Sequence, residues 1–531
     1  MRKLFSFVSL FLILCSSYAQ EFNTHKVMLD DNGKLLSWVR PQDKAYDRVS
    51  RLAWDFLLNK VRVEPNGLKS FYTYCCIDGT SLKGGAWPHN PAGLFAMLAD
   101  SSSEYYAYSG DRRVADLVGG LLDYQLAHGT TPANWKWGNM PYASADHGAT
   151  EFRGAHESDY DKKHAGRGDG FGAIEPDKSA ELGAGYLKFY EMTGETRYRD
   201  AAIAIANTLA KQVRTGDSQK SPWPFRVYAE TGIVREEYAS DEIAMVRLFD
   251  ELVRLNLGDA KQYRSTRDIA WRWLLDVPMK NNTWVQYFED IPIMDKLWNL
   301  NQYAPMETAR YLMDHPDTDP QWRAHVAALI AFVEKTFAKD IEGYSGIEWG
   351  ANTISEQLDY DHKMGSHTSR YASVVARWTE LESDPESKDK AFRSLNWATY
   401  MCREDGIVND QPRLDGNGIW FSDGYGDYIR HFMYAMGAQP EWAPSGENHL
   451  LRSTSIVREI KYSPSMISYT TFDNHATETL RLGFVPKSVA AGDKLLPKRD
   501  DLGSPGWTFD PERKVLRIRH DDSRSVKISG E

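Results

Sequence analysis

Cysteine is scarce in this sequence, with four residues among 531. Cys15 lies in an apolar N-terminal run, and Cys75 and Cys76 are neighbours, which rarely pair with each other. Small exported domains that are held together by disulfides carry many more cysteines. The composition therefore excludes a disulfide framework. We expect buried free thiols, with one bridge to Cys402 as the alternative.

Basic residues are also in deficit. Lysine and arginine number 63 against 74 aspartate and glutamate residues, which gives a formal net charge of −11. An acidic chain is a poor partner for nucleic acids. The histidines are scattered rather than spaced as metal ligands, so the sequence predicts no metal site and no cofactor.

Long apolar runs are absent after the N-terminus, so no membrane span is expected. The first residues combine Arg2 and Lys3 with an apolar run over residues 4–15 and the small-residue pattern Ser17-Tyr18-Ala19. This pattern is typical of a cleavable secretory signal over residues 1–19. Leu14 is too bulky for the lipoprotein alternative. We expect a secreted or periplasmic protein.

The stretch over residues 168–210 predicts two antiparallel helices. Apolar residues recur at helical spacing on both sides of Gly194, at Leu182, Tyr186, Phe189 and Tyr190 and then at Tyr198, Ala202, Ile205 and Leu209. Thr193-Gly194 ends the first helix, and so short a turn makes the two helices antiparallel.

The same helix pair recurs along the chain. Four further pairs are expected at 92–109 with 112–127, 241–256 with 263–275, 307–313 with 321–337, and 368–382 with 388–402. Single helices at 46–60 and 425–436 would pair with each other in a closed ring. Twelve helices arranged in this way predict a mainly α fold, an (α/α)6 six-hairpin barrel over residues 20–437.

After residue 437 the pattern changes. Residues 437–450 are rich in proline and glycine, which is typical of a linker. Alternating apolar and polar residues at 466–472, 479–484 and 515–520 predict strands. We therefore expect a small all-β domain over residues 450–531 that packs against the barrel.

The segments that begin the first helix of each pair carry most of the candidate site residues. They would meet at one mouth of a closed barrel, where helix N-termini present free N–H groups. Plain N-capping explains the Ser, Asp and Thr residues there but not the Trp, His, Lys and Tyr residues. The side chains singled out at these positions are Trp87, His89, Glu175, Asp177, Lys178, Glu307, His367, Tyr425 and Asp427.

Two long segments on the same side, residues 129–177 and 282–303, are expected to be functional loops. The second contributes Tyr287 and Glu289 as candidate binding residues. Aromatic residues make up 12% of the chain, and its tryptophans often stand beside Gly, Asn and Asp. Because sugar rings stack on such side chains, the composition favours a carbohydrate substrate.

Four fragments carry a resemblance to a known group of enzymes. They are residues 174–178, 286–290, 301–303 and 364–368, which read IEPDK, QYFED, NQY and MGSHT. Together they resemble a β-glucuronidase-type family of exported α/α toroids from polysaccharide-degrading bacteria. The resemblance implies a substrate that contains a uronic acid.

A uronic acid brings a carboxylate that needs cations, and Lys178, Arg370 and Arg430 could supply them. Arg370 and Arg430 could equally form interhelical salt bridges. Hydrolysis needs two carboxyl groups, one protonated and one ionised. Glu175, beside Phe171 and Ile174, is expected to be the protonated acid. Asp177 is expected to be ionised, with Asp427 or Glu289 as a partner from across the mouth.

Elimination remains the alternative, because it needs a base at C5 and an acid at O4, and His367 and Tyr425 could serve. A glycan-binding protein without catalysis is a third possibility, which the many carboxylates and histidines argue against. Terpene cyclases and prenyltransferases with α/α toroids need an acidic metal motif or an apolar cavity, and the sequence has no DDxxD. We favour a glycoside hydrolase that releases terminal glucuronic acid.

Overall fold

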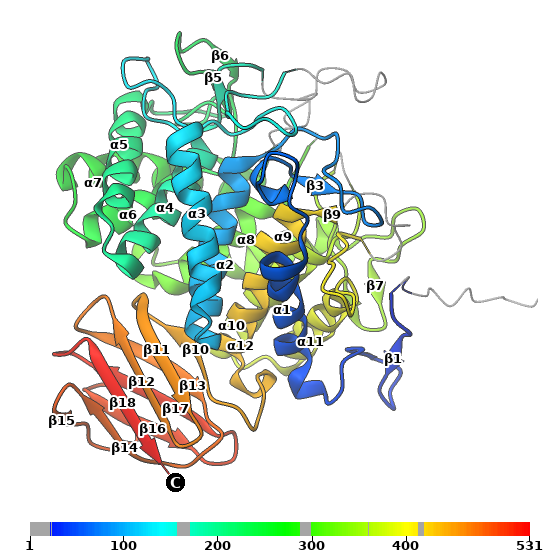
Figure 1. Cartoon of the computed structure of the whole chain (residues 1–531), viewed down its shortest axis with the longest axis vertical. Helices are drawn as coiled ribbons and strands as arrows, with labels where there is room; N and C mark the ends of the chain where they lie inside the picture. The colour runs from blue at the N-terminus through cyan, green and yellow to red at the C-terminus, as the bar shows by residue number, and fades with distance from the viewer. Residues whose placement is uncertain are drawn as a thin grey trace, which may run out of the picture.

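The computed structural model describes residues 22, 24–156, 170–286, 299–358, 361–411 and 419–530. Figure 1 shows a ring of helices with a β-sandwich packed against one end. The predicted fold class, an (α/α)6 barrel followed by a small β domain, is confirmed. The proposed signal segment, residues 1–19, lies outside the described residues.

Six inner helices line the axis of the ring. Each contacts the next, and the last contacts the first, so the ring is closed. Most of their residues are buried, on more than one face of each helix, and small or apolar residues make up much of their sequences. The inner helices are α2 (Pro91–Ser109), α4 (Pro176–Thr193), α6 (Ile243–Arg254), α8 (Tyr303–Asp314), α10 (Gly365–Leu381) and α12 (Tyr428–Ala438).

Six outer helices cover the inner ring and bury only one face. In helix α3 (Arg112–His128), for example, the buried residues Val114, Val118, Leu121 and Leu122 share one face. The outer helices are α1 (Ala45–Asp55), α3 (Arg112–His128), α5 (Thr196–Gln212), α7 (Ala260–Leu274), α9 (Trp322–Phe337) and α11 (Pro385–Thr399).

Short turns set the antiparallel pairing. Gly110 and Gly194 end α2 and α4 with φ of 74° and 81°, a left-handed conformation that favours glycine. The side chain of Asp111 then accepts a hydrogen bond from the Arg113 N–H and caps α3.

Among the described residues, three helices adjoin a wider, π-helical turn. Phe56–Lys60 continues α1, Leu275–Met279 continues α7, and Ser422–Asp427 leads into α12. The last of these turns contacts α2 and α10, and Asp427 is its final residue.

Short antiparallel strands join the loops at one end of the barrel. Strand β3 (Cys76–Ile77) pairs with β9 (Ile419–Trp420), and β4 (Ala173–Ile174), β5 (Arg226–Tyr228) and β6 (Val234–Glu236) form a small sheet. Two further hairpins are β1 (Met28–Leu29) with β2 (Leu35–Leu36), and β7 (Ile347–Glu348) with β8 (Ala351–Asn352).

The C-terminal domain is a sandwich of two antiparallel sheets. One sheet has the order β10-β13-β17-β16 and the other β11-β12-β18-β14-β15. Their bounds are β10 (His449–Ser453), β11 (Val457–Ser463), β12 (Met466–Thr471), β13 (Ala476–Arg481), β14 (Pro486–Ala491), β15 (Lys494–Leu495), β16 (Gly506–Asp510), β17 (Val515–His520) and β18 (Ser525–Gly530). Strands β10 and β11 contact α2, and β10 also contacts α12.

The three described cysteines, Cys75, Cys76 and Cys402, are buried free thiols, as the sequence predicts. Among the described residues, no helix is both long and apolar enough to cross a membrane.

Candidate functional site

Backbone hydrogen bonds tie the starts of the six inner helices into one rim. The β3–β9 pair joins the segments before α2 and α12, and β4–β5 joins those before α4 and α6. Ser240 N–H donates to Val285 O at 2.8 Å, Asn301 bridges to Gln357, and Gly365 N–H donates to Asp410 O at 2.8 Å. The inner helices therefore start at the same end of the barrel, as the sequence predicts.

A cavity of about 50 Å³ lies among the inner helices, just inside this rim. Its volume accommodates a few water molecules. Charged side chains from five of the six inner helices or their starts line it, including Asp100, Glu181, Lys188, Asp241, Arg247, Glu307 and Arg430.

One half of the interior is rich in guanidinium groups. Glu307 on α8 lies 3.1 Å from Arg247, 3.6 Å from Arg310 and 3.5 Å from Arg370. Burial alone would raise the pKa of Glu307, but these cations together with Arg430 lower it to about 2. Glu307 is therefore ionised and fixed among four positive charges.

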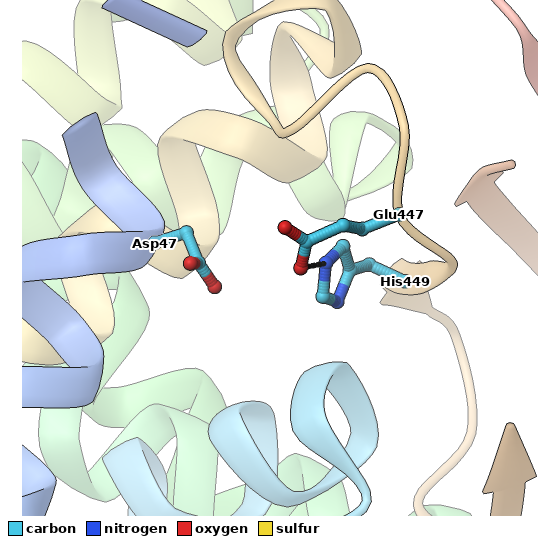
Figure 2. Close-up of side chains that lie close together, drawn as sticks. All are labelled: Asp47, Glu447 and His449. Carbon is cyan, nitrogen blue, oxygen red and sulfur yellow. Dashed lines mark ion pairs between the residues drawn. The ribbon is translucent and has the colours of Figure 1, made fainter. Parts of the chain in front are cut away.

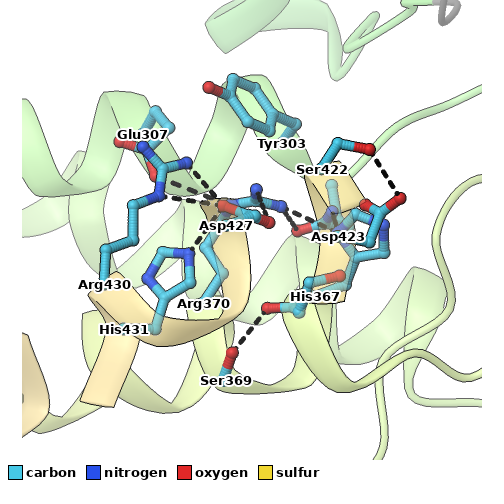
Figure 3. A network of polar contacts seen from close by, with 12 residues as sticks. Tyr303, Glu307, His367, Ser369, Arg370, Ser422, Asp423, Asp427, Arg430 and His431 are labelled. Carbon is cyan, nitrogen blue, oxygen red and sulfur yellow. Dashed lines mark hydrogen bonds and ion pairs between the residues drawn. The ribbon is translucent and has the colours of Figure 1, made fainter. Parts of the chain in front are cut away.

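Asp427 is the second carboxylate of this half (Figure 3). Its Oδ1 accepts from Arg430 Nε and Nη2 at 3.0 and 2.6 Å and from His431 Nε2 at 3.1 Å, and its Oδ2 accepts from Arg370. Burial opposes ionisation, yet the two arginines hold the pKa of Asp427 well below its usual range. The structure thus brings four predicted site residues, Glu307, Asp427, Arg370 and Arg430, into one network of salt bridges.

His367 borders the same network, and its protonation follows from its neighbours. Arg370 Nη1 donates to His367 Nδ1 at 2.9 Å, and Gln302 Nε2 lies 2.7 Å from the same nitrogen. Burial, with Arg370, lowers the imidazole pKa to about 3. Because guanidinium groups only donate, the neutral ring carries its proton on Nε2 and is a hydrogen-bond donor there.

Tyr303 joins the cationic half to an acidic half. Its ring lies 4.2 Å from the Arg370 guanidinium carbon and 5.2 Å from Lys178 Nζ, and its hydroxyl donates to Glu181. Lys178 Nζ is 3.6 Å from Glu181 Oε2. Burial raises the pKa of Tyr303 well above its usual range, so the phenol is protonated.

In the acidic half, two carboxyl groups share one amide. Gln286 Nε2 donates to Asp177 Oδ2 at 3.2 Å and to Asp241 Oδ2 at 3.4 Å. Burial and the negative charge of Glu181 raise the pKa of Asp241 well above its usual range. Asp177 lies in the first turn of α4, where the helix N-terminus favours an ionised carboxylate. The two carboxyl groups therefore have different electrostatic surroundings, buried beside Glu181 for Asp241 and at a helix N-terminus for Asp177.

Glu175 differs from its expected setting. Phe171 is 53% exposed, and Glu175 Oε1 accepts from Arg226 Nε at 2.7 Å, with both of these charged side chains fully buried. A guanidinium partner favours the ionised carboxylate. The expectation that an apolar environment keeps Glu175 protonated is wrong, because strand β5 supplies a cation.

Other predicted site residues lie outside these clusters. His89 packs edge-on against Phe95 and Phe152, and burial lowers its pKa to about 3. The Tyr425 hydroxyl donates to Gly406 O at 3.2 Å and accepts from Val408 N–H at 3.1 Å, away from the axis. Tyr287 and Glu289 lie outside the described residues.

Trp87 is half-buried at the rim. Its ring meets Trp420 edge-to-face at 5.4 Å, and the β3–β9 pair holds the two segments together. This aromatic pair is the part of the rim best suited to stacking on a sugar.

Sequence reasoning missed several residues of the interior. Asp241 lies at the start of the predicted helix 241–256 but is not among the predicted site residues, and neither are Gln286 and Tyr303, which belong to the fragments 286–290 and 301–303. Arg247 lies about one turn inside α6 and Arg310 about two turns inside α8. Polar residues one or two turns beyond each helix start were the available signal.

Neither known protein families nor curated proteins match this sequence. Solved structures do. A sugar epimerase from a ruminal bacterium has a TM-score of 0.51 at 10% identity, over 74% of this chain and 98% of that one. Cellobiose 2-epimerases from Spirochaeta thermophila DSM 6192 and Bacillus thermoamylovorans B4167 have TM-scores of 0.54 and 0.53 at 11% and 12% identity. Each match covers 75% of this chain, and 98% and 99% of the respective epimerase.

The chain is an α/α toroid. Identities near 10% show the fold alone. The predicted resemblance to β-glucuronidase-type enzymes in particular stays a prediction.

Proposed function

We propose that this toroid is a glycoside hydrolase that releases terminal glucuronic acid from uronic-acid-containing oligosaccharides. The observation that carries the proposal is the division of the barrel interior. A pair of carboxyl groups in different electrostatic surroundings lies beside a cluster with an excess of guanidinium groups.

The guanidinium-rich half supports an anionic substrate. Four arginines, Arg247, Arg310, Arg370 and Arg430, surround two carboxylates, Glu307 and Asp427. Asp100 also pairs with Arg430, at 3.2 Å, but it is shared with Lys188. The positive excess can be offset by the carboxylate of a uronic acid, which arginine binds through paired hydrogen bonds.

The acidic half supports hydrolysis. In this proposal Asp241, held protonated, donates its proton to the glycosidic oxygen as the bond to C1 breaks. Asp177, held ionised, stabilises the developing positive charge and forms the new bond to C1 or activates water that does so. The proton that water releases returns the acid to its starting state.

A shared donor limits the spacing of this pair. Since both hydrogen bonds start at Gln286 Nε2, with lengths of 3.2 and 3.4 Å, the two bonded oxygens are close neighbours. Retaining enzymes separate their carboxyl groups by about 5–5.5 Å and inverting ones by about 6.5–9.5 Å. The proposal leaves the stereochemical outcome open, and analysis of the anomer released first would determine it.

The elimination alternative is less well supported. It needs a base for the C5 proton, and the two best-placed candidates are both held as donors. Tyr303 is protonated, with its hydroxyl donated to Glu181, and His367 carries its proton on Nε2. Both suit an acid or an oxyanion stabiliser better than a base.

The test uses oligosaccharides that end in glucuronic acid. We expect new reducing ends without the ultraviolet absorbance of an unsaturated uronate. Asp177→Asn and Asp241→Asn should each lower kcat by about 10²–10⁴. A substrate with an acidic leaving group should restore the activity of Asp241→Asn but not that of Asp177→Asn, because such a group leaves without protonation.

Asp116→Asn, on the exposed face of α3, is the matched control and should keep full activity. Unsaturated products would establish elimination instead. Full activity in both site variants, with hydrolysis intact, would remove the proposed pair.

A further inference from the structure

Three side chains that are distant in the sequence meet where the barrel joins the β domain. Asp47 comes from α1, Glu447 from the linker and His449 from the start of β10 (Figure 2). One ligand atom from each lies within 4.8 Å of the others. This cluster lies outside the candidate catalytic site, because none of its residues lines the central cavity.

The imidazole of His449 is held by one nitrogen and directs the other at a carboxylate. Its Nδ1 lies 3.0 Å from the carbonyl oxygen of Tyr108, which can only accept, so Nδ1 carries the proton. The other nitrogen, Nε2, is buried without a hydrogen-bond partner and faces Glu447 Oε2 at 3.4 Å. The side chain is only 7% exposed, so bulk water does not satisfy it. An imidazole nitrogen and a carboxylate oxygen that face each other can hold a proton or a metal cation between them.

Tyr108, at the end of α2, supports two members of the cluster. Its ring stacks on His449 with centroids 4.0 Å apart, and its hydroxyl donates to Asp47 Oδ1 at 2.9 Å. Its carbonyl belongs to the last turn of α2, where carbonyls have no partner within the helix. A histidine held through Nδ1 by a backbone carbonyl, and a carboxylate held by a hydroxyl, are the usual support around metal ligands.

We propose that Asp47, Glu447 and His449 bind a divalent transition-metal ion of the Zn²⁺ type. Two ligands at about 2.1 Å from a tetrahedral zinc ion are about 3.4 Å apart, the observed separation of His449 Nε2 and Glu447 Oε2. An imidazole with two carboxylates suits such an ion, whereas Ca²⁺ and Mg²⁺ prefer oxygen ligands alone. Water completes the fourth position.

Arg51 is the competitor of this ion. Its Nε lies 2.7 Å from Asp47 Oδ2 and its Nη2 lies 2.6 Å from Glu447 Oε2. Lys44 is 3.4 Å from Glu447 Oε1. Both cations are about half exposed, so they can turn into solvent. Arg51 thus holds the two carboxylates together until a metal ion displaces it.

A bound ion would connect α1, the linker and β10. Tyr108 contacts two of its ligands and would link the ion to α2. An ion that binds only the folded chain raises its unfolding temperature. The experiment therefore measures Zn²⁺ binding to the chelator-treated, untagged full chain by titration calorimetry, and the Tm with and without Zn²⁺. We expect one site per chain and a higher Tm with Zn²⁺.

The variants separate a metal site from a cluster of ion pairs. His449→Gln and Glu447→Gln should weaken Zn²⁺ binding at least tenfold and abolish the rise in Tm. Arg51→Gln keeps all three ligands and removes the competitor, so it should bind Zn²⁺ more tightly. Glu404→Gln, an exposed acid that pairs with Arg48, is the control and should bind like the natural chain.

Absence of Zn²⁺ binding in both the natural chain and Arg51→Gln would overturn the proposal. Undiminished binding in His449→Gln would do the same. If His449→Gln does not fold, Arg51→Gln alone decides, because it removes no ligand. Equal affinity for Ca²⁺ and Zn²⁺ would contradict the assigned class of metal.

Discussion

Replacing Asp427 with asparagine should destabilise the barrel strongly, although the two side chains have nearly the same shape. Each carboxylate oxygen of Asp427 accepts from a buried arginine, Oδ2 from Arg370 and Oδ1 from Arg430. Whichever oxygen becomes the amide NH₂, its hydrogens face a guanidinium donor. The change also leaves buried positive charge without its partner. Loss of one member of a buried pair costs about 3–5 kcal/mol.

The assay is urea unfolding followed by tryptophan fluorescence and far-ultraviolet circular dichroism at pH 7. The matched control is Asp405→Asn, since Asp405 lies 2.6 Å from Arg403 but both side chains are exposed, and we expect less than about 1 kcal/mol. Because the folded pKa of Asp427 is depressed, its stabilisation is present above its unfolded pKa and is lost as the pH falls below about 4. The loss in free energy of unfolding caused by Asp427→Asn should therefore be smaller at acidic pH than at pH 7. A variant as stable as the Asp405→Asn control at pH 7 would refute the reasoning.

Two more predictions concern His89 and Trp87. Burial lowers the pKa of His89 to about 3, so the unfolded chain takes up a proton that the folded chain does not, and stability falls as the pH drops below about 6.5. His89→Met should reduce that fall in the free energy of unfolding by up to about 1.4 kcal/mol per pH unit. Thermal unfolding between pH 7 and 4 measures it, and an unchanged dependence of stability on pH would contradict the prediction. Trp87→Ala should raise KM for the oligosaccharide and leave kcat nearly unchanged, since stacking holds substrate and transition state alike. Steady-state kinetics that show a lower kcat at constant KM would contradict that role.

Helix order and register could be predicted because they depend on local signals. The apolar period of residues 182–209 and the stop at Gly194 are both contained in one short stretch, and the structure has α4 and α5 there. The ring follows from repetition of that pair, because each pair must bury the same face.

The chemistry of the site depends on partners that no local pattern reveals. Arg226, the partner of Glu175, lies 51 positions further on in a three-residue strand. Tyr425 points away from the axis because it lies within the π-helical turn before α12, which shifts side-chain directions. Asp47 and His449 lie on opposite sides of the whole barrel sequence, so no ligand spacing could have indicated their meeting.

The ion pair between Arg430 and Asp100 connects positions 330 residues apart. Both side chains are buried, so neither is stable without its partner. A chain that ends before α12 leaves the interior of α2 open to water, and its charges can only be solvated. The last inner helix therefore supplies the partners of charges that the other inner helices bury. Shortening the barrel by one hairpin would not give a smaller toroid, but a chain that exposes the charged side chains of Asp100 and Arg370 without their partners.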